Sequence, residues 1–161
     1  LSVSVVSTAP TWAKFFKYYV KDNYSTEYNL LLDRFYLGLP FLKEIRQDIN
    51  EKLEAVGHIK AIDGRKLQIR SAHSSLNSLI QSCGAIIMKK ALTLLWETIK
   101  THDAFVVANI HDEFQIETRE MLAETVGKIA ITSIEEAGKH FQLRVPITGE
   151  YKVGKNWAET H

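Results

Sequence analysis

The sequence has one cysteine, no long apolar run and no internal repeat. Because Cys83 stands alone, the chain cannot form an internal disulfide or a zinc site built on a CxxC pair, and a buried, reduced thiol is expected. No window approaches about 18 consecutive apolar residues, and residues 1–25 mix lysines with aromatic residues, which argues against a membrane span and a signal peptide. We therefore expect a cytoplasmic protein.

The composition is that of an ordinary globular protein. Of its 161 residues, 45% are hydrophobic and 24% are charged, which argues against disordered and fibrous classes. The formal net charge of +1 does not decide for or against nucleic-acid binding, because a basic face and an acidic face can cancel. We expect one domain over residues 1–161, in which residues 1–30 follow no clear period and are difficult to place, with helix as the favoured structure.

The first half of the chain predicts two helices and a β-ribbon. Apolar residues recur near every 3.6 positions over residues 29–56, with a break at Gly38-Leu39-Pro40, and Gly57 suits a helix end. Residues 58–62 and 65–69 flank Asp63-Gly64, a pair typical of a type I′ hairpin turn, in which both central residues have positive φ.

The second half predicts two long helices. One covers about residues 72–99, with Ser71 as its N-cap, and the other covers about residues 119–138, ending near Gly138. The first should bury one apolar stripe, formed by Leu76, Ile80, Cys83, Ile87, Ala91 and Leu94.

Three strands accompany these helices. The pattern predicts a tight hairpin formed by residues 104–110 and 114–117, with His111, Asp112 and Glu113 at its tip. It also predicts a last strand over residues 147–153. The predicted fold class is α+β, an antiparallel sheet with long helices packed against it.

The hairpin tip is the first candidate site. Such tips usually carry Gly or Asn, whereas His111, Asp112 and Glu113 place functional groups where backbone strain must be tolerated and solvent is near. Carboxylates there suit a hard cation such as Mg²⁺, which takes oxygen ligands. The alternative is a solvated acidic turn.

A polar stripe on the long helix is the second candidate. His73, Asn77 and Gln81 are spaced by four and so share one side of the helix. Such donors can test base-pair geometry in the DNA minor groove, where every pair presents acceptors at purine N3 and pyrimidine O2. The alternative is an ordinary solvent-facing side.

Several linked motifs carry a resemblance to a known family. They are Asp63-Gly64-Arg65, Arg70-Ser71-Ala72-His73, Leu76-Asn77, Gln81-Ser82-Cys83-Gly84-Ala85, Ile110-His111-Asp112-Glu113-Phe114-Gln115 and Gly154-Lys155-Asn156-Trp157. In order and spacing, the chain from about Leu31 to His161 resembles the last third of family A DNA polymerases, the bacterial polymerase I type, with the phage replicative branch nearest.

The resemblance implies a palm-type sheet and a role for each candidate residue. Asp112 would be one of two aspartates that hold a catalytic pair of Mg²⁺ ions, supported by Glu113 and His111. The helix residues His73, Asn77 and Gln81 would face the duplex, with Arg70 and Gln115 as further contacts. The implied partners are primer–template DNA and deoxynucleoside triphosphates, in the host cytoplasm if a phage encodes the protein.

Two motifs of that family are missing. These are the strand that supplies the other aspartate and the helix of the form R-x-x-x-K-x-x-x-Y-G that grips the triphosphate. The chain also starts at Leu1 instead of methionine. We therefore expect about half an active site, inactive alone, with the upstream half on another polypeptide or on a longer chain.

Two other readings stay open. One is a non-catalytic DNA-binding module derived from a polymerase. The other is a metal-dependent phosphohydrolase that uses His111 and Asp112. It would need further histidines around the metal, and no motif spacing brings together the remaining five, His58, His73, His102, His140 and His161.

Overall fold

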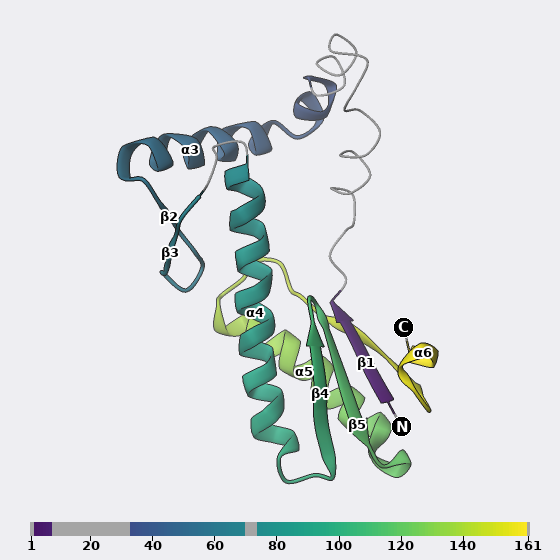
Figure 1. Ribbon diagram of the computed structural model, residues 1–161. Coiled ribbons are helices and arrows are strands. Elements are labelled where there is room, and N and C mark those ends of the chain that lie inside the picture. The colour runs from purple at the N-terminus through teal and green to yellow at the C-terminus, as the bar shows by residue number, and fades with distance from the viewer. Residues whose placement is uncertain (1, 8–32, 70–73, 161) are drawn as a thin grey trace. The chain divides into compact units, whose positions relative to one another are not determined.

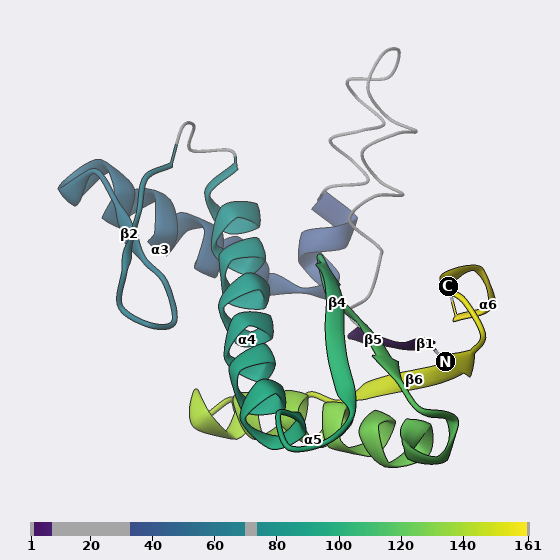
Figure 2. The same cartoon turned by 60° about the horizontal axis from the view of Figure 1, so that its bottom comes forward.

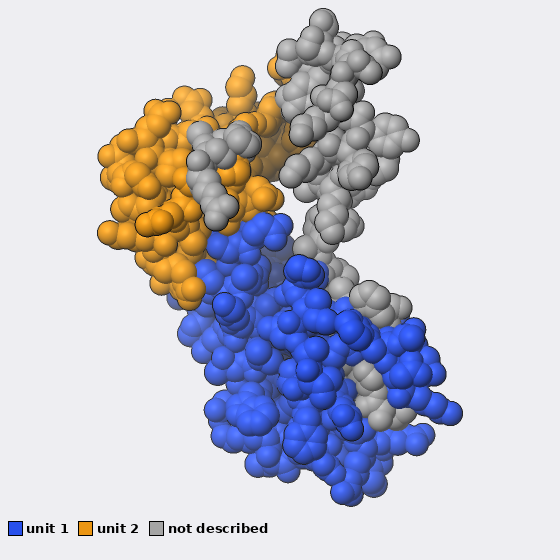
Figure 3. Space-filling view, viewed as in Figure 1, with its two compact units in different colours: residues 1–8, 81–161 blue, residues 9–80 orange. Residues whose placement is uncertain are grey.

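A computed structural model describes residues 2–7, 33–69 and 74–160 of the chain. They fall into two compact units, one of residues 1–8 and 81–161 and one of residues 9–80 (Figure 3). We describe each unit by itself. The expectation of a single domain stays a prediction.

The larger unit is built on a four-stranded antiparallel sheet of order β4-β5-β1-β6 (Figure 1). Its strands are β1 (Ser2–Ser7), β4 (Ala104–Ile110), β5 (Glu113–Thr118) and β6 (Gly149–Gly154). The predicted hairpin and the last strand are confirmed, and with them the α+β class.

Strand β1 was not predicted. Residues 2–7 form a central strand, paired with β5 on one side and β6 on the other, where the sequence analysis favoured a helix. Valines alternating with serine from Ser2 to Val5 were the available signal, since β-branched residues favour strands. The partners of β1 lie more than a hundred positions later, so no local pattern revealed the pairing.

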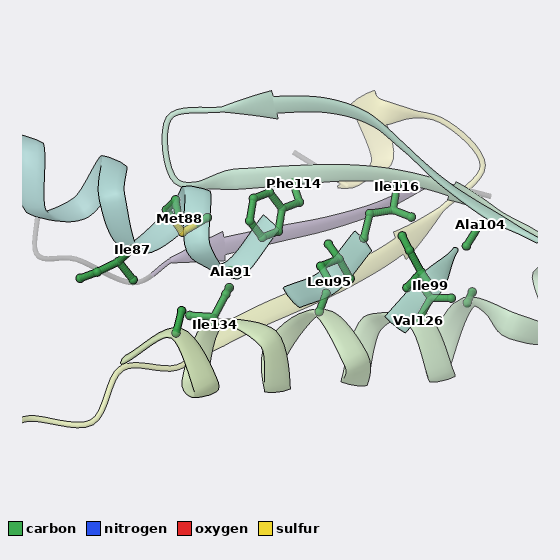
Figure 4. Close-up of a cluster of buried hydrophobic side chains, with 13 residues drawn as sticks. Ile87, Met88, Ala91, Leu95, Ile99, Ala104, Phe114, Ile116, Val126 and Ile134 are labelled. Carbon is green, nitrogen blue, oxygen red and sulfur yellow. The ribbon is translucent and has the colours of Figure 1, made fainter. Parts of the chain in front are cut away.

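Helices α4 (Ser75–Ile99) and α5 (Ala123–His140) pack on the same face of the sheet, and Figures 2 and 4 show α5 running along it. A 3-10 turn, η2 (Glu120–Leu122), precedes α5, and a short α6 (Trp157–Thr160) follows β6. Between sheet and helices lie fully buried side chains, namely Leu95, Ile99, Phe114, Ile116, Val126 and Ile134. Each of these contributes about 1.5–3 kcal/mol through burial.

The buried side of α4 differs from the predicted stripe. Ile80 is 57% exposed and Leu94 is only partly buried, whereas Ala91, Leu95 and Ile99 are fully buried. After Ala91 both the third and the fourth residue are leucines, so spacing alone could not decide which one faces the core. The predicted end of the helix at position 99 is confirmed, while Ser71 and residues 72–73 lie outside the described residues.

By length and composition alone, α4 could also cross a membrane. A core helix of a soluble protein passes the same test. In this chain the apolar side of α4 is buried in the core described above, through Ala91, Leu95 and Ile99.

The observed end of α5, at His140, lies close to the predicted end near Gly138. The helix continues to His140, and Gln142 follows with φ 53°. A Cβ on Gly138 would lie 2.6 Å from Cγ1 of Ile147, so this glycine serves close packing instead of ending the helix.

The smaller unit confirms the expected helices. Residues 33–38 are helical, Leu39 is not, and α3 (Pro40–Val56) follows the break. Gly57 ends α3 with φ 72°, a left-handed conformation that glycine adopts without cost. Ser75, at the start of α4, donates a hydrogen bond of 2.8 Å from Oγ to Oδ1 of Asn50 on α3.

The ribbon is present, but its turn is not type I′. The strands are β2 (Ile59–Lys60) and β3 (Lys66–Leu67), and Gly64 has φ 84° whereas Asp63 does not have positive φ. The amide of Gly64 donates to the carbonyl of Ala61, and the amide of Ala61 to the carbonyl of Arg65, both at 2.9 Å. This pattern is a three-residue loop closed by a glycine bulge.

Candidate active site

The tip of the β4–β5 hairpin is a two-residue connection, His111 and Asp112. His111 has φ 56°, a left-handed conformation uncommon outside glycine, and its side chain is exposed. The side chain of Asp112 is half-buried. The expected backbone strain is seen at His111, and the expected access to solvent is seen at both His111 and Asp112.

Glu113 differs from its expected place. It is not at the exposed tip but is the first residue of β5, 5% exposed and paired with Ile110 on β4 and Val6 on β1. Gln115 Nε2 donates a hydrogen bond to Glu113 Oε1, and Gln115 is 2% exposed. The two residues share the side of β5 opposite to the core residues Phe114 and Ile116, because side chains alternate along a strand.

A β-bulge in β4 shapes the same side of the hairpin. Val106 pairs with Ile116, but the next pair is Ala108 with Gln115, so Val107 is left over. Without this extra residue, Ala108 and Ile110 would face the core. The bulge turns them toward the side that carries Gln115 and Glu113, the re-aiming that bulges near functional sites provide.

The helix residues Asn77 and Gln81 are both exposed and lie one turn apart on α4. Within the part of the chain that the structure describes, neither side chain takes part in a hydrogen bond, so their amide donors are available to a ligand. His73 and Arg70, the other expected duplex contacts, lie outside the described residues.

The ion expected at the hairpin is Mg²⁺. Asp112 offers an accessible oxygen ligand of the kind this ion prefers, while Glu113 is buried and accepts a hydrogen bond from Gln115. Among residues 2–7, 33–69 and 74–160, no three His, Cys, Asp or Glu side chains are grouped to hold a metal. The phosphohydrolase reading, which needs such a group, gains no support.

Cys83 is a free thiol on α4 and is half-buried. Burial raises the pKa of this thiol, which favours its protonated form. This agrees with a structural cysteine, although one less buried than expected.

The comparisons with known proteins agree with the order of these motifs. The family model for DNA polymerase family A matches residues 25–159. The chain belongs to DNA polymerase family A. The resemblance seen in the sequence, and the phage and bacterial relatives expected from it, are confirmed.

Similar polymerases come from phages and from bacteria. This family A chain is 39% identical over 118 residues to the DNA-directed DNA polymerase of Enterobacteria phage T3, and 37% identical to that of Escherichia phage T7. Each match covers 64% of the chain but 16% of the phage protein. DNA polymerase I of Aquifex aeolicus is 30% identical over 152 residues, covering 88% of the chain and 26% of that protein. The chain thus spans about a sixth to a quarter of these relatives.

Proposed function

We propose that the chain is the part of a DNA-directed DNA polymerase that supplies one metal-binding aspartate and minor-groove contacts to primer–template DNA. The observation that supports this proposal is the two-residue turn of the hairpin. In it His111, with a left-handed backbone conformation, precedes a partly exposed Asp112, and the buried, hydrogen-bonded pair of Glu113 and Gln115 follows. Membership of family A gives the turn its chemical context.

In this proposal Asp112 holds Mg²⁺ together with a carboxylate from the upstream half of the polymerase. Residues 2–7, which form the neighbouring strand β1, contain only Ser and Val, so β1 adds no such ligand. Bound Mg²⁺ would supply charge stabilisation to the primer hydroxyl and the incoming triphosphate. Glu113, hydrogen-bonded to Gln115, would fix the strand beneath Asp112, and His111 would shape the turn.

Asn77 and Gln81 would contact the duplex near the primer end. Both are exposed, with amide donors not used by the described residues, and both can reach acceptors that every base pair presents in the minor groove. His73 and Arg70 would extend this contact, whereas Gln115, which is 2% exposed and donates to Glu113, would hold the strand that follows Asp112. The partners of the chain would be primer–template DNA, deoxynucleoside triphosphates and the upstream half, in the cytoplasm of the cell that replicates the DNA.

Primer extension tests the proposal. The chain alone should not extend a primer. A chimera in which it replaces the matching portion of the phage T3 polymerase should do so with Mg²⁺. Asp112→Asn in the chimera should lower the rate by about 10²-fold or more, since it removes charge stabilisation of the transition state. Glu117→Gln, a matched loss of an exposed carboxylate on β5, should leave extension near the parent rate.

The outcomes separate the rival readings. Robust extension by the chain alone would contradict the half-site proposal. A chimera that binds primer–template but never extends it would favour the non-catalytic DNA-binding module. Equal extension by the parent chimera and Asp112→Asn would remove Asp112 from the metal site.

A further inference from the structure

Two lysines lie directly opposite each other on the β2–β3 ribbon. Lys60 on β2 pairs in register with Lys66 on β3, and both side chains are exposed. Directly opposed residues of an antiparallel pair have Cβ atoms about 5 Å apart, so their charges repel and destabilise the ribbon. This arrangement carries a cost to folding.

No ion pair in the described part of the chain offsets that repulsion. The ion pairs found there do not include Lys60 or Lys66. The carboxylate within the ribbon itself, that of Asp63 in the turn, is held by Arg65 at 2.6 Å. The charges of Arg65 and Asp63 therefore cancel, and the ribbon carries two further positive charges, those of Lys60 and Lys66.

The orientation of the lysines is fixed by the other side of the ribbon. Ile59 and Ala61 are each 6% exposed, and alternation along β2 directs Lys60 the opposite way. A slip by one residue would expose Ile59, so the apolar side locks the register that brings the lysines together. The ribbon thus has one apolar side and one basic side.

We propose that Lys60 and Lys66 bind backbone phosphates of the DNA duplex. A row of phosphates offers regularly spaced negative charge. Each lysine would pair with a phosphate, which offsets the repulsion between the two lysines and releases counterions from the DNA. Such contacts position a duplex without reading its sequence, as the proposed amide contacts from α4 also would. The inference rests on the proposed function, because it takes the polyanion to be primer–template DNA.

Salt-dependent binding of the whole chain to a fluorescent primer–template duplex tests this inference. Each lysine that neutralises a phosphate adds about 0.9 to the slope of log affinity against log salt. Lys60→Gln with Lys66→Gln should lower that slope by about 2 and weaken binding about tenfold or more near 0.1 M salt. Lys60→Arg with Lys66→Arg should restore both. Lys128→Gln, the same charge loss on the exposed side of α5, should change neither by a comparable amount.

Charge reversal separates binding from folding. Lys66→Glu creates an opposite-charge pair with Lys60, so the thermal midpoint should stay equal or rise while DNA affinity falls. Wild-type slope and affinity in both the double Gln variant and Lys66→Glu would overturn the inference and leave the proposed function standing. Absence of duplex binding by the wild-type chain would count against the proposed function itself.

Discussion

Gln115 and Glu113 form a buried hydrogen-bonded pair on the side of β5 that faces away from the core helices. They are 2% and 5% exposed, so neither has ready access to water as a substitute partner. The pair links a residue expected to contact DNA with one expected to support the metal. In the structure both stabilise the strand that follows Asp112.

Gln115→Leu should therefore lower the free energy of unfolding by about 1–3 kcal/mol, because the Glu113 carboxylate loses a donor inside the protein. Urea denaturation followed by circular dichroism measures this change. Gln68→Leu is the matched control, since Gln68 is exposed, and it should change stability by less than about 0.5 kcal/mol. Equal effects of the two substitutions would show that the pair does not stabilise β5.

The left-handed backbone of His111 gives a second prediction. His111→Val should lower the free energy of unfolding by about 1–2 kcal/mol, because a β-branched residue fits φ 56° poorly. His111→Gly should stay within about 1 kcal/mol of wild type, since relief of strain and added freedom of the unfolded chain oppose each other. Thermal or urea denaturation provides the measurement.

Gln142, with φ 53°, is the control for this backbone effect. Its Val and Gly variants should change stability in the same directions. In the polymerase chimera only the His111 variants should also lower primer extension. Loss of extension in the Gln142 variants would mean that the effect comes from folding and not from the turn.

The sequence predicted those elements whose signals are local. The break at Pro40, the helix end at Gly57 and the hairpin strands around His111 each follow from residues within a few positions. The burial of Glu113 and Gln115 could not be predicted from the sequence. Both residues face away from the core helices and lie beside β1, a strand from the other end of the chain. A pattern of alternation reports the side of a strand but not what covers it.

The candidate site was predictable to the same extent. His111 and Asp112 were found because their residue types are unusual at a tight turn. The β-bulge at Val107 was not found, since an extra residue in a strand leaves no mark in an apolar run. The opposition of the two lysines was not predicted either, because it depends on the register of the ribbon. The predicted turn had two residues, whereas the observed turn has three, and the extra residue shifts the pairing of the strands.

The ion pair in the ribbon turn gives a prediction about pH. The hydrogen bonds and charge of Arg65 lower the pKa of the Asp63 carboxyl below its ordinary value. A lowered folded-state pKa means that the stabilisation is present above the ordinary aspartate pKa and is lost as pH falls through the folded value. NMR titration of the Asp63 carboxyl should show this low pKa, and Arg65→Gln should bring it back toward normal. An unchanged titration in Arg65→Gln would contradict the pairing.

Two helical glycines should respond to alanine with opposite signs. A Cβ on Gly127 of α5 would lie 2.5 Å from Cδ2 of Tyr151, so Gly127→Ala should lower the free energy of unfolding by about 1–3 kcal/mol through overpacking. Gly84 of α4 has no atom within 4 Å of the added Cβ, so Gly84→Ala should raise it by about 0.5–1 kcal/mol through helix propensity. Urea denaturation of both variants tests the packing of α5 against β6, and the same sign in both would contradict it.

The central place of β1 in the sheet yields the last prediction. Val5 pairs with Phe114 on β5 and Tyr151 on β6, so its amide must donate to one neighbour or the other. Val5→Pro removes that donor and should lower the free energy of unfolding by about 1–3 kcal/mol, because a carbonyl inside the sheet loses its partner. Val107→Pro is the matched control, since Val107 lies in the bulge of the edge strand β4, where proline is better tolerated. If Val5→Pro proved as stable as Val107→Pro, residues 2–7 would not be a central strand, and the place beside the Asp112 turn would be open to a strand from the upstream half.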